Sequence, residues 1–197
     1  MREKIPPRFA VDCMLGKLAK WLRILGFDTV YFSRIQDKEL LALARREGRV
    51  LLTRDYHLSL RMRDKQVVFI ESDAWPTQLR QVLNRFQLRD FIKPYSRCLE
   101  CNCLLQPTSR EAVRQLVPHY VYTQVKEFSI CPCCSRVYWR GTHFQDMERK
   151  IAAILGEEGS AEAKKGNRKR DIRKNRGAVT KRIEQKSQLN RNNNKEK

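Results

Sequence analysis

No apolar run in this sequence approaches the roughly 20 residues that a transmembrane helix needs. The first residues, MREKIPPRFAV, also lack an apolar core of the length that a signal peptide carries. We therefore expect a cytoplasmic protein that has no membrane partner. In that reducing compartment, the seven cysteines are expected to be thiols or metal ligands rather than structural disulfides.

Acidic residues are the minority among the charged residues, with 22 Asp and Glu against 41 Lys and Arg and a net charge of +19. Residues 164–197 hold 14 basic and 3 acidic residues, a net charge of +11, and the other residues carry +8. An anionic polymer is the natural partner, because binding to phosphates releases their condensed counterions. Nucleic acid is such a polymer, either free or in a ribosome or other ribonucleoprotein. The tail alone is explained equally well as an aid to solubility.

The chain divides by composition into three parts. Residues 157–197 have too few apolar side chains to bury a core and are predicted to be disordered. Residues 95–155 contain six of the cysteines and end in a predicted closing helix. In residues 8–92, short apolar runs alternate with segments of helical periodicity, which predicts an α/β domain with a mostly parallel sheet and helices on both faces. The predicted strands are residues 8–12, 27–32, 49–53 and 66–72, and the predicted helices are residues 14–26, 37–48, 56–64 and 76–88.

Acidic residues stand at equivalent positions along this alternation. Asp12 ends the first predicted strand, Asp55 follows the third, and Asp37 is placed as the N-cap of the helix after the second. The carboxyl ends of parallel strands meet at one edge of a sheet, so we expect these carboxylates to lie near one another. Converging acids favour a divalent cation such as Mg²⁺ or Mn²⁺, which prefers oxygen ligands. Taken singly, Asp37 is explained as a helix cap and Asp55 as a turn residue.

Two other functions that place acids at such an edge lack their motifs here. A phospho-receiver domain needs a pair of acids after the first strand and a lysine after a late strand, and the segment AVDCM has a single acid. A hydrolase with an Asp-x-Asp nucleophile is excluded because Cys13 and Met14 follow Asp12. Metal-dependent hydrolysis of phosphodiesters remains the favoured chemistry for this edge.

The cysteines form two C-x-x-C pairs that are typical of a zinc site. Cys98 and Cys101 lie in CLEC, and Cys131 and Cys134 lie in CPCC, with 29 residues between the pairs. That interval is long, so the insert is expected to form its own hairpin or helix. We prefer these four as ligands of a structural zinc, since four thiolates leave no open position for water. The segments CNC and CPC leave Cys103 and Cys133 as alternative ligands.

Three segments together resemble a known family, the Mut-seven C-terminal RNase domain. They are RFAVDCMLGKLAKWLRILGFDT, DKELLALARREGRVLLTRDYHL and, after the paired cysteines, VYWRGTH, and the resemblance covers roughly residues 8–150. It implies a PIN-like nuclease fold that carries a zinc ribbon, with the basic tail outside it. It also implies Mg²⁺- or Mn²⁺-dependent hydrolysis of RNA at Asp12, Asp37 and Asp55. Asp73 is the candidate for the fourth acid that many PIN-like domains carry.

Several basic residues are candidates for RNA contacts. Arg23 and Arg54 are suited to phosphate contacts, or equally to ion pairs at the surface. Arg136 and Arg140 alternate with aromatic residues, which fits base stacking combined with phosphate binding. A small core for the cysteine-rich module explains the same aromatic residues. These aromatic residues are Tyr120, Tyr122, Tyr138 and Trp139.

Three further residues have local interpretations. Cys13 is interpreted as a small buried apolar residue, and the ring of His143 is expected to pack beside Trp139. The hydroxyl of Thr53 is placed to orient Asp55 or a metal-bound water. The sequence identifies no oligomer interface, and it leaves open a non-catalytic function as an RNA- or ribosome-binding protein.

Overall fold

The computed structural model describes residues 5–60 and 66–156, apart from the side chains of Thr142 and His143. The predicted tail, residues 157–197, and the predicted position of the His143 ring therefore lie outside the described part. The chain divides after Met147 into two compact units, and both sheets belong to the first. The predicted boundaries at 8–92 and 95–155 stay predictions. No helix among the described residues is long and apolar enough to cross a membrane.

The first sheet consists of four parallel strands, β1 (Phe9–Val11), β2 (Thr29–Tyr31), β3 (Val50–Thr53) and β4 (Val67–Phe69). Their order is β2-β1-β3-β4. The register pairs Val11 with both Tyr31 and Leu52, so these strands end at a common edge. The parallel sheet and its helices confirm the predicted α/β class.

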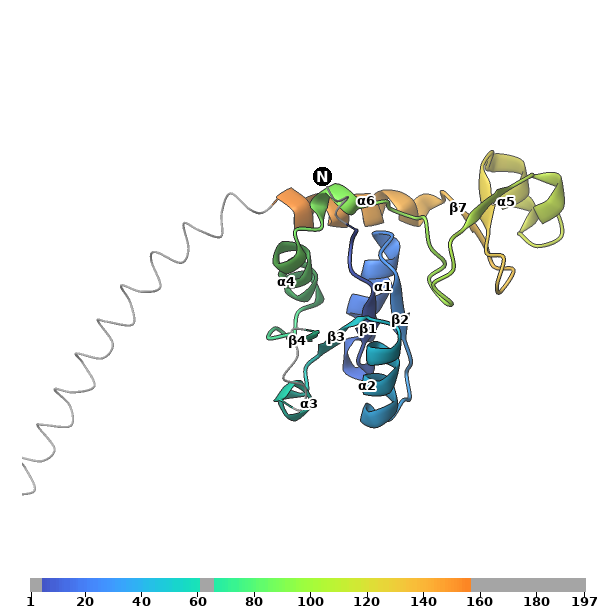
Figure 1. Cartoon of the computed structure of the whole chain (residues 1–197). Coiled ribbons are helices and arrows are strands. Elements are labelled where there is room, and N and C mark those ends of the chain that lie inside the picture. The colour runs from blue at the N-terminus through green and yellow to red at the C-terminus, as the bar shows by residue number, and fades with distance from the viewer. Residues whose placement is uncertain (1–4, 61–65, 157–197) are drawn as a thin grey trace, which may run out of the picture. The chain divides into compact units, whose positions relative to one another are not determined.

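Helices cover both faces of this sheet, as Figure 1 shows. Leucine and alanine side chains of α2 (Asp37–Arg46) and α3 (Tyr56–Leu60) pack with Ala10 and Leu51 on one face. On the opposite face, Phe9 contacts Phe86 of α4 (Trp75–Phe86) edge to face. α1 (Gly16–Ile24) packs against α4, and the rings of Trp21 and Trp75 stack with centroids 4.4 Å apart. Packing against these helices fixes the sheet, and with it the strand ends at which the predicted acids lie.

The helix ends follow the sequence signals with one correction. Gly26 has a φ of 93° after α1, where a Cβ would also meet the Lys93 carbonyl oxygen, so only glycine fits there. The predicted N-cap of α2 at Asp37 is wrong, because Gln36 occupies that position and forms a capping box with Glu39. Asp37 is instead the first residue of the helix.

The second sheet is antiparallel and belongs to the cysteine-rich segment. Its strands β5 (Gln106–Thr108), β6 (Phe128–Ile130) and β7 (Val137–Trp139) lie in the order β5-β6-β7. The insert between the cysteine pairs contains α5 (His119–Gln124) and builds a small core of Val113, Val117, Val121 and Phe128, which confirms that it forms its own structure. The remaining elements are the short helices η1 (Cys13–Leu15), η2 (Arg89–Phe91) and η3 (Glu111–Val113) and the long helix α6 (Thr142–Gly156).

Arg23 joins the parallel sheet to the first cysteine pair. Its side chain is 6% exposed, and its Nε donates to the Thr29 carbonyl at 2.8 Å. Its Nη1 donates to the carbonyls of Leu99 and Glu100, between the two cysteines, at 2.7 and 2.9 Å. The prediction of an RNA contact or surface ion pair at Arg23 is therefore corrected, because the guanidinium is buried and held by backbone carbonyls.

Asn102 adds further hydrogen bonds to the contact between the parallel sheet and the first cysteine pair. The Thr29 backbone N–H donates to Asn102 Oδ1 at 3.0 Å, and Asn102 Nδ2 donates to Asp28 Oδ1 at 2.9 Å. Asp28 also accepts a hydrogen bond from Arg49 at 2.5 Å. Burial opposes the ionisation of Asp28, but the bonds from Arg49 and Asn102 outweigh it and lower its pKa. The contact between the sheet and the cysteine-rich segment is thus a buried polar network.

Arg23→Met is expected to lower the free energy of unfolding by about 3 kcal/mol, because it leaves three buried carbonyls without their charged donor. Urea unfolding followed by tryptophan fluorescence measures this difference. Lys20→Met is the matched control, since Lys20 is exposed on the same helix and should change stability by no more than about 0.5 kcal/mol. Equal free energies of unfolding for the Arg23 and Lys20 variants would contradict the role of Arg23 in joining the parallel sheet to the first cysteine pair.

Candidate active site and cysteine cluster

The carboxylate of Asp12 is held at the end of the central strand β1. Asp12 is 6% exposed, and its backbone N–H donates to the Leu52 carbonyl at 3.0 Å. The hydroxyl of the fully buried Thr53 donates to Asp12 Oδ2 at 2.7 Å. A neutral donor therefore fixes this carboxylate and leaves its negative charge in place.

Thr53 connects Asp12 to Asp55. The backbone N–H of Asp55 donates to Thr53 Oγ1 at 2.9 Å, so the hydroxyl accepts from Asp55 while it donates to Asp12. Asp55 Oδ1 accepts from the Leu58 N–H at 3.0 Å and so caps the start of α3. Asp12 and Asp55 are thus both hydrogen-bonded to Thr53. The sequence predicts that this hydroxyl orients Asp55 or a metal-bound water, whereas in the structure it holds the Asp12 carboxylate and the backbone of Asp55.

Cys13 lies beside the acidic edge, directly after Asp12. The Cys13 thiol is exposed, so its interpretation as a buried apolar residue is wrong. A hydrogen bond to Asp12 and burial raise the pKa of Cys13, and the charges of Asp12 and, more weakly, Asp37 act in the same direction. Asp37 itself is exposed in the first turn of α2.

The acids form a looser group than the cysteines. Across residues 5–60 and 66–156, no three carboxylates bring an oxygen each within 4.8 Å of one another. Asp73 has a side chain that is 87% exposed, and it forms an ion pair with Arg54, which bears out the ion-pair alternative for Arg54. Mg²⁺ is commonly held by one or two carboxylates and several waters, so an ion at this edge would need only one or two of these acids as ligands.

Four cysteines gather in the geometry of a tetrahedral metal site. The Sγ atoms of Cys98, Cys101, Cys131 and Cys134 lie within 4.8 Å of one another. The Cys98–Cys134 and Cys101–Cys131 sulfur distances are 3.6 and 3.3 Å. A zinc ion with Zn–S bonds of about 2.3 Å requires sulfurs about 3.8 Å apart, so the four thiols fit zinc with small adjustments. This confirms the predicted grouping of the outer cysteines.

The two pairs are built as matching turns. Asn102 and Ser135, which follow the second cysteine of each pair, have φ angles of 69° and 57°. Their backbone N–H groups donate to the carbonyls of Cys98 and Cys131. Burial opposes the ionisation of Cys98, but hydrogen bonds from the Cys101 N–H and from Tyr138 outweigh it and lower its pKa to about 6. A thiolate, which is the form that binds zinc, is therefore favoured at this position.

Cys103 and Cys133 form a disulfide. The expectation that the chain has no disulfide is therefore wrong for this pair. Each of the two residues lies beside one of the matching turns, and the turns face each other across the cluster, which brings their Cα atoms to 6.5 Å. In the sequence, the segments CNC and CPC indicated that Cys103 and Cys133 belong with the other cysteines. They did not distinguish a disulfide from two alternative metal ligands.

Comparison with models of protein families identifies the family of this chain. A family model described as the Mut7-C RNAse domain matches residues 7–151. The chain belongs to this family. Comparisons with curated proteins and with solved structures found no match. Membership indicates a nuclease of the RNase type and RNA as its class of substrate.

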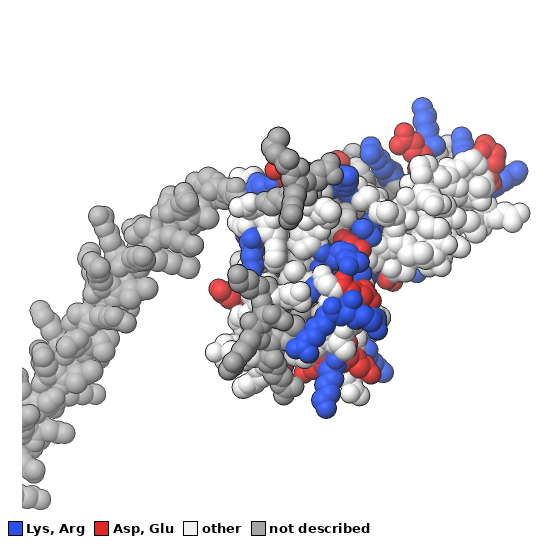
Figure 2. Space-filling model, in the orientation of Figure 1, with Lys and Arg blue, Asp and Glu red and all other residues white. Residues whose placement is uncertain are grey.

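The predicted RNA-binding arginines of this Mut7-C RNAse domain have different surroundings. Arg136 is exposed and donates to Glu100 at 2.8 Å, and the Arg140 guanidinium lies over the Phe144 ring at 5.1 Å. Figure 2 shows Lys and Arg side chains interspersed with Asp and Glu side chains on the face that it draws. On this face, acidic side chains therefore interrupt the positive charge.

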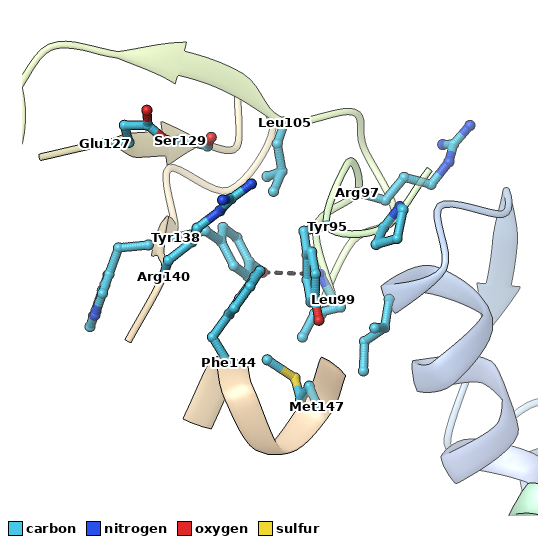
Figure 3. Close-up of a pocket in the computed structure, with 13 residues that line it drawn as sticks. Tyr95, Arg97, Leu99, Leu105, Glu127, Ser129, Tyr138, Arg140, Phe144 and Met147 are labelled. Atoms are coloured by element: carbon cyan, nitrogen blue, oxygen red, sulfur yellow. Dashed lines mark hydrogen bonds between the residues drawn. The ribbon is translucent and has the colours of Figure 1, made fainter. Parts of the chain in front are cut away.

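Arg140 lines a pocket of about 250 Å³ that sequence reasoning did not identify (Figure 3). Its walls include Tyr95, Tyr138 and Phe144, and the rings of Tyr95 and Phe144 lie 4.4 Å apart. The Tyr138 oxygen accepts from the Leu99 N–H at 3.0 Å and lies 3.1 Å from Cys98 Sγ. An aromatic wall of the pocket is thus attached directly to the cysteine cluster of the Mut7-C RNAse domain.

Removing zinc is expected to loosen the cysteine-rich part of this domain, because the ion would hold the four thiols together and its loss would leave the Cys103–Cys133 disulfide to link the two turns. With the disulfide intact, we expect one zinc per chain, lost to a strong chelator together with the near-ultraviolet circular dichroism of Tyr138 and Trp139. Cys98→Ser should lose the ion, whereas Cys13→Ser, outside the cluster, should retain it. Unchanged circular dichroism after complete removal of zinc would contradict a structural role.

Proposed function

We propose that this chain is a Mg²⁺- or Mn²⁺-dependent ribonuclease with a PIN-like fold and a zinc ribbon. The observation that carries the proposal is the hydrogen-bonded series from Asp55 through Thr53 to Asp12, at the ends of the adjacent strands β1 and β3. The series joins the Asp12 carboxylate to the Asp55 backbone, and parallel sheets bind ligands at this end of their strands, which supports the proposal. Family membership supplies RNA as the class of substrate.

In this proposal each residue has a distinct part. Asp12 and Asp55 would hold the cation, with Thr53 fixing the Asp12 carboxylate, and Asp37 would add a third, exposed carboxylate. When bound, such an ion activates water and neutralises charge on the phosphate. Arg54 is available to a phosphate once its exposed ion pair with Asp73 opens, since surface pairs of this kind are weak. Asp73 then adds the fourth acid.

In this proposal the cysteine-rich segment binds the RNA substrate. Arg136 and Arg140 bind phosphates, and the aromatic residues beside them offer faces on which unpaired bases stack. The pocket at Tyr138 and Phe144 has room for a base, with Arg140 at its lining. RNA held there is an extended single strand rather than a duplex, because stacking on side chains requires splayed bases.

A non-catalytic RNA- or ribosome-binding protein is the alternative, and one observation favours it. Among the described residues, the acids do not come as close together as metal ligands usually do. In that case RNA binding would be unaffected by EDTA and no cleavage would follow.

Asp12→Asn and Asp55→Asn are each expected to reduce Mn²⁺-dependent cleavage of single-stranded RNA by about 100-fold or more, because each removes a charge that holds the ion. Initial rates on end-labelled RNA, with circular dichroism to confirm folding, measure the effect. Asp90→Asn is the matched control, since Asp90 is exposed and follows α4 away from the edge. Full activity in both Asp12 and Asp55 variants would refute the proposed site.

Arg140→Ala is expected to weaken binding to single-stranded RNA and to reduce the salt dependence of log K by about 0.7, which corresponds to one phosphate contact. Fluorescence anisotropy across a salt series measures this slope, and Asp12→Asn in all samples prevents cleavage. Arg85→Ala, which removes the same charge from an exposed position of α4, is the control. A slope that falls equally in both variants would indicate general electrostatics and no contact at Arg140.

A further inference from the structure

The six cysteines of the two turns form two overlapping groups. Cys98, Cys101, Cys131 and Cys134 are one group whose sulfur atoms lie within 4.8 Å of one another. A second group meets the same distance limit and consists of Cys101, Cys103, Cys131 and Cys133. Cys101 and Cys131 belong to both groups, and their sulfurs lie 3.3 Å apart.

Two tetrahedra that share an edge have this pattern of sulfurs. Thiolate sulfur has lone pairs for two metal ions, so the shared pair can bridge while each ion takes two further sulfurs of its own. The edge of a zinc–sulfur tetrahedron is about 3.8 Å, close to the separation of the shared pair. We propose that the reduced chain binds a second zinc ion, through Cys103 and Cys133 and through bridging sulfurs of Cys101 and Cys131.

The charge balance of the cluster supports this arrangement. One Zn²⁺ with four thiolates has a formal charge of about −2, and a second Zn²⁺ with two more thiolates adds none. The basic groups at the cluster therefore face the same charge in both forms. Those groups include Arg23, which donates to the carbonyls of Leu99 and Glu100, and Arg136, which pairs with Glu100.

The Cys103–Cys133 disulfide decides whether the second ion binds. A dithiol reductant supplies two electrons and two protons to the disulfide, which gives two thiols and the oxidised reductant as a new disulfide. Each thiol releases its proton when its sulfur binds Zn²⁺. Cys133 is exposed and Cys103 half-buried, so a reductant has access to the bond. Reoxidation by a small disulfide removes two ligands of the second ion and leaves all four ligands of the first.

The zinc content of the full-length protein tests this inference independently of any nuclease activity. Native mass spectrometry should find two zinc ions per chain after reduction with a phosphine and one after reoxidation. The double variant Cys103→Ser with Cys133→Ser should hold one ion in both conditions. Asp12→Asn with Asp55→Asn should still hold two when reduced, which excludes zinc at the acidic edge.

One zinc ion in the reduced wild-type protein would overturn the inference, and so would two in the double serine variant. A second measurement on the wild-type chain decides the matter where that variant does not fold. After reduction and exchange for cadmium-113, nuclear magnetic resonance should show two tetrathiolate signals coupled through shared sulfurs. A single signal, or two without coupling, would show that no sulfur bridges two ions.

Discussion

The contact between the parallel sheet and the cysteine-rich segment depends on the buried positive charge of Arg23. Burial lowers the pKa of this guanidinium, while the nearby Cys98, Cys101 and Glu100 oppose that effect, and three carbonyls accept its hydrogen bonds. One of these carbonyls lies at the start of β2 and two lie between the cysteines of the first pair. A charge that is costly to bury thus has its partners only when the sheet and the cysteine turn are both formed. The joint is specific because neither side alone satisfies the guanidinium.

The acidic edge follows from the order of the strands. Because β1 and β3 are adjacent and parallel, residues that end them become neighbours although they are far apart in the sequence. Thr53 then sets their spacing through one hydroxyl that donates to Asp12 and accepts from Asp55. Asp37 begins α2, the helix that follows β2, and is exposed there. Hydrogen bonds fix the carboxylates of Asp12 and Asp55, so these two acids are the better-defined part of the candidate site.

Local patterns predicted the features that depend on neighbours in the chain. Apolar runs and helical periodicity predicted the parallel sheet, and C-x-x-C spacing predicted the four clustered thiols. The predictions that were wrong concern residues whose partners are distant in the sequence, or residues whose neighbours form the local hydrogen bonds instead. Arg23 is buried by a segment more than 70 residues away, which no local pattern reports. Asp37 lost the cap position because Gln36 and Glu39 satisfy the helix start together. The facing positions of Cys103 and Cys133 depend on how two distant turns meet.

Tyr138 joins the cysteine cluster to the pocket. Its oxygen lies between the Leu99 N–H and the Cys98 sulfur, and its ring forms a wall of the pocket beside Arg140. A Cys98 thiolate that held zinc would accept a hydrogen bond from this hydroxyl, so in the proposed function the ion would fix the ring on which a base stacks. The cysteine pairs thereby do more than close a loop: they determine the shape of the surface next to them. A change in the metal content of the cluster would act on this wall through Tyr138 and through Leu99, which lines the same pocket and follows Cys98 in the chain.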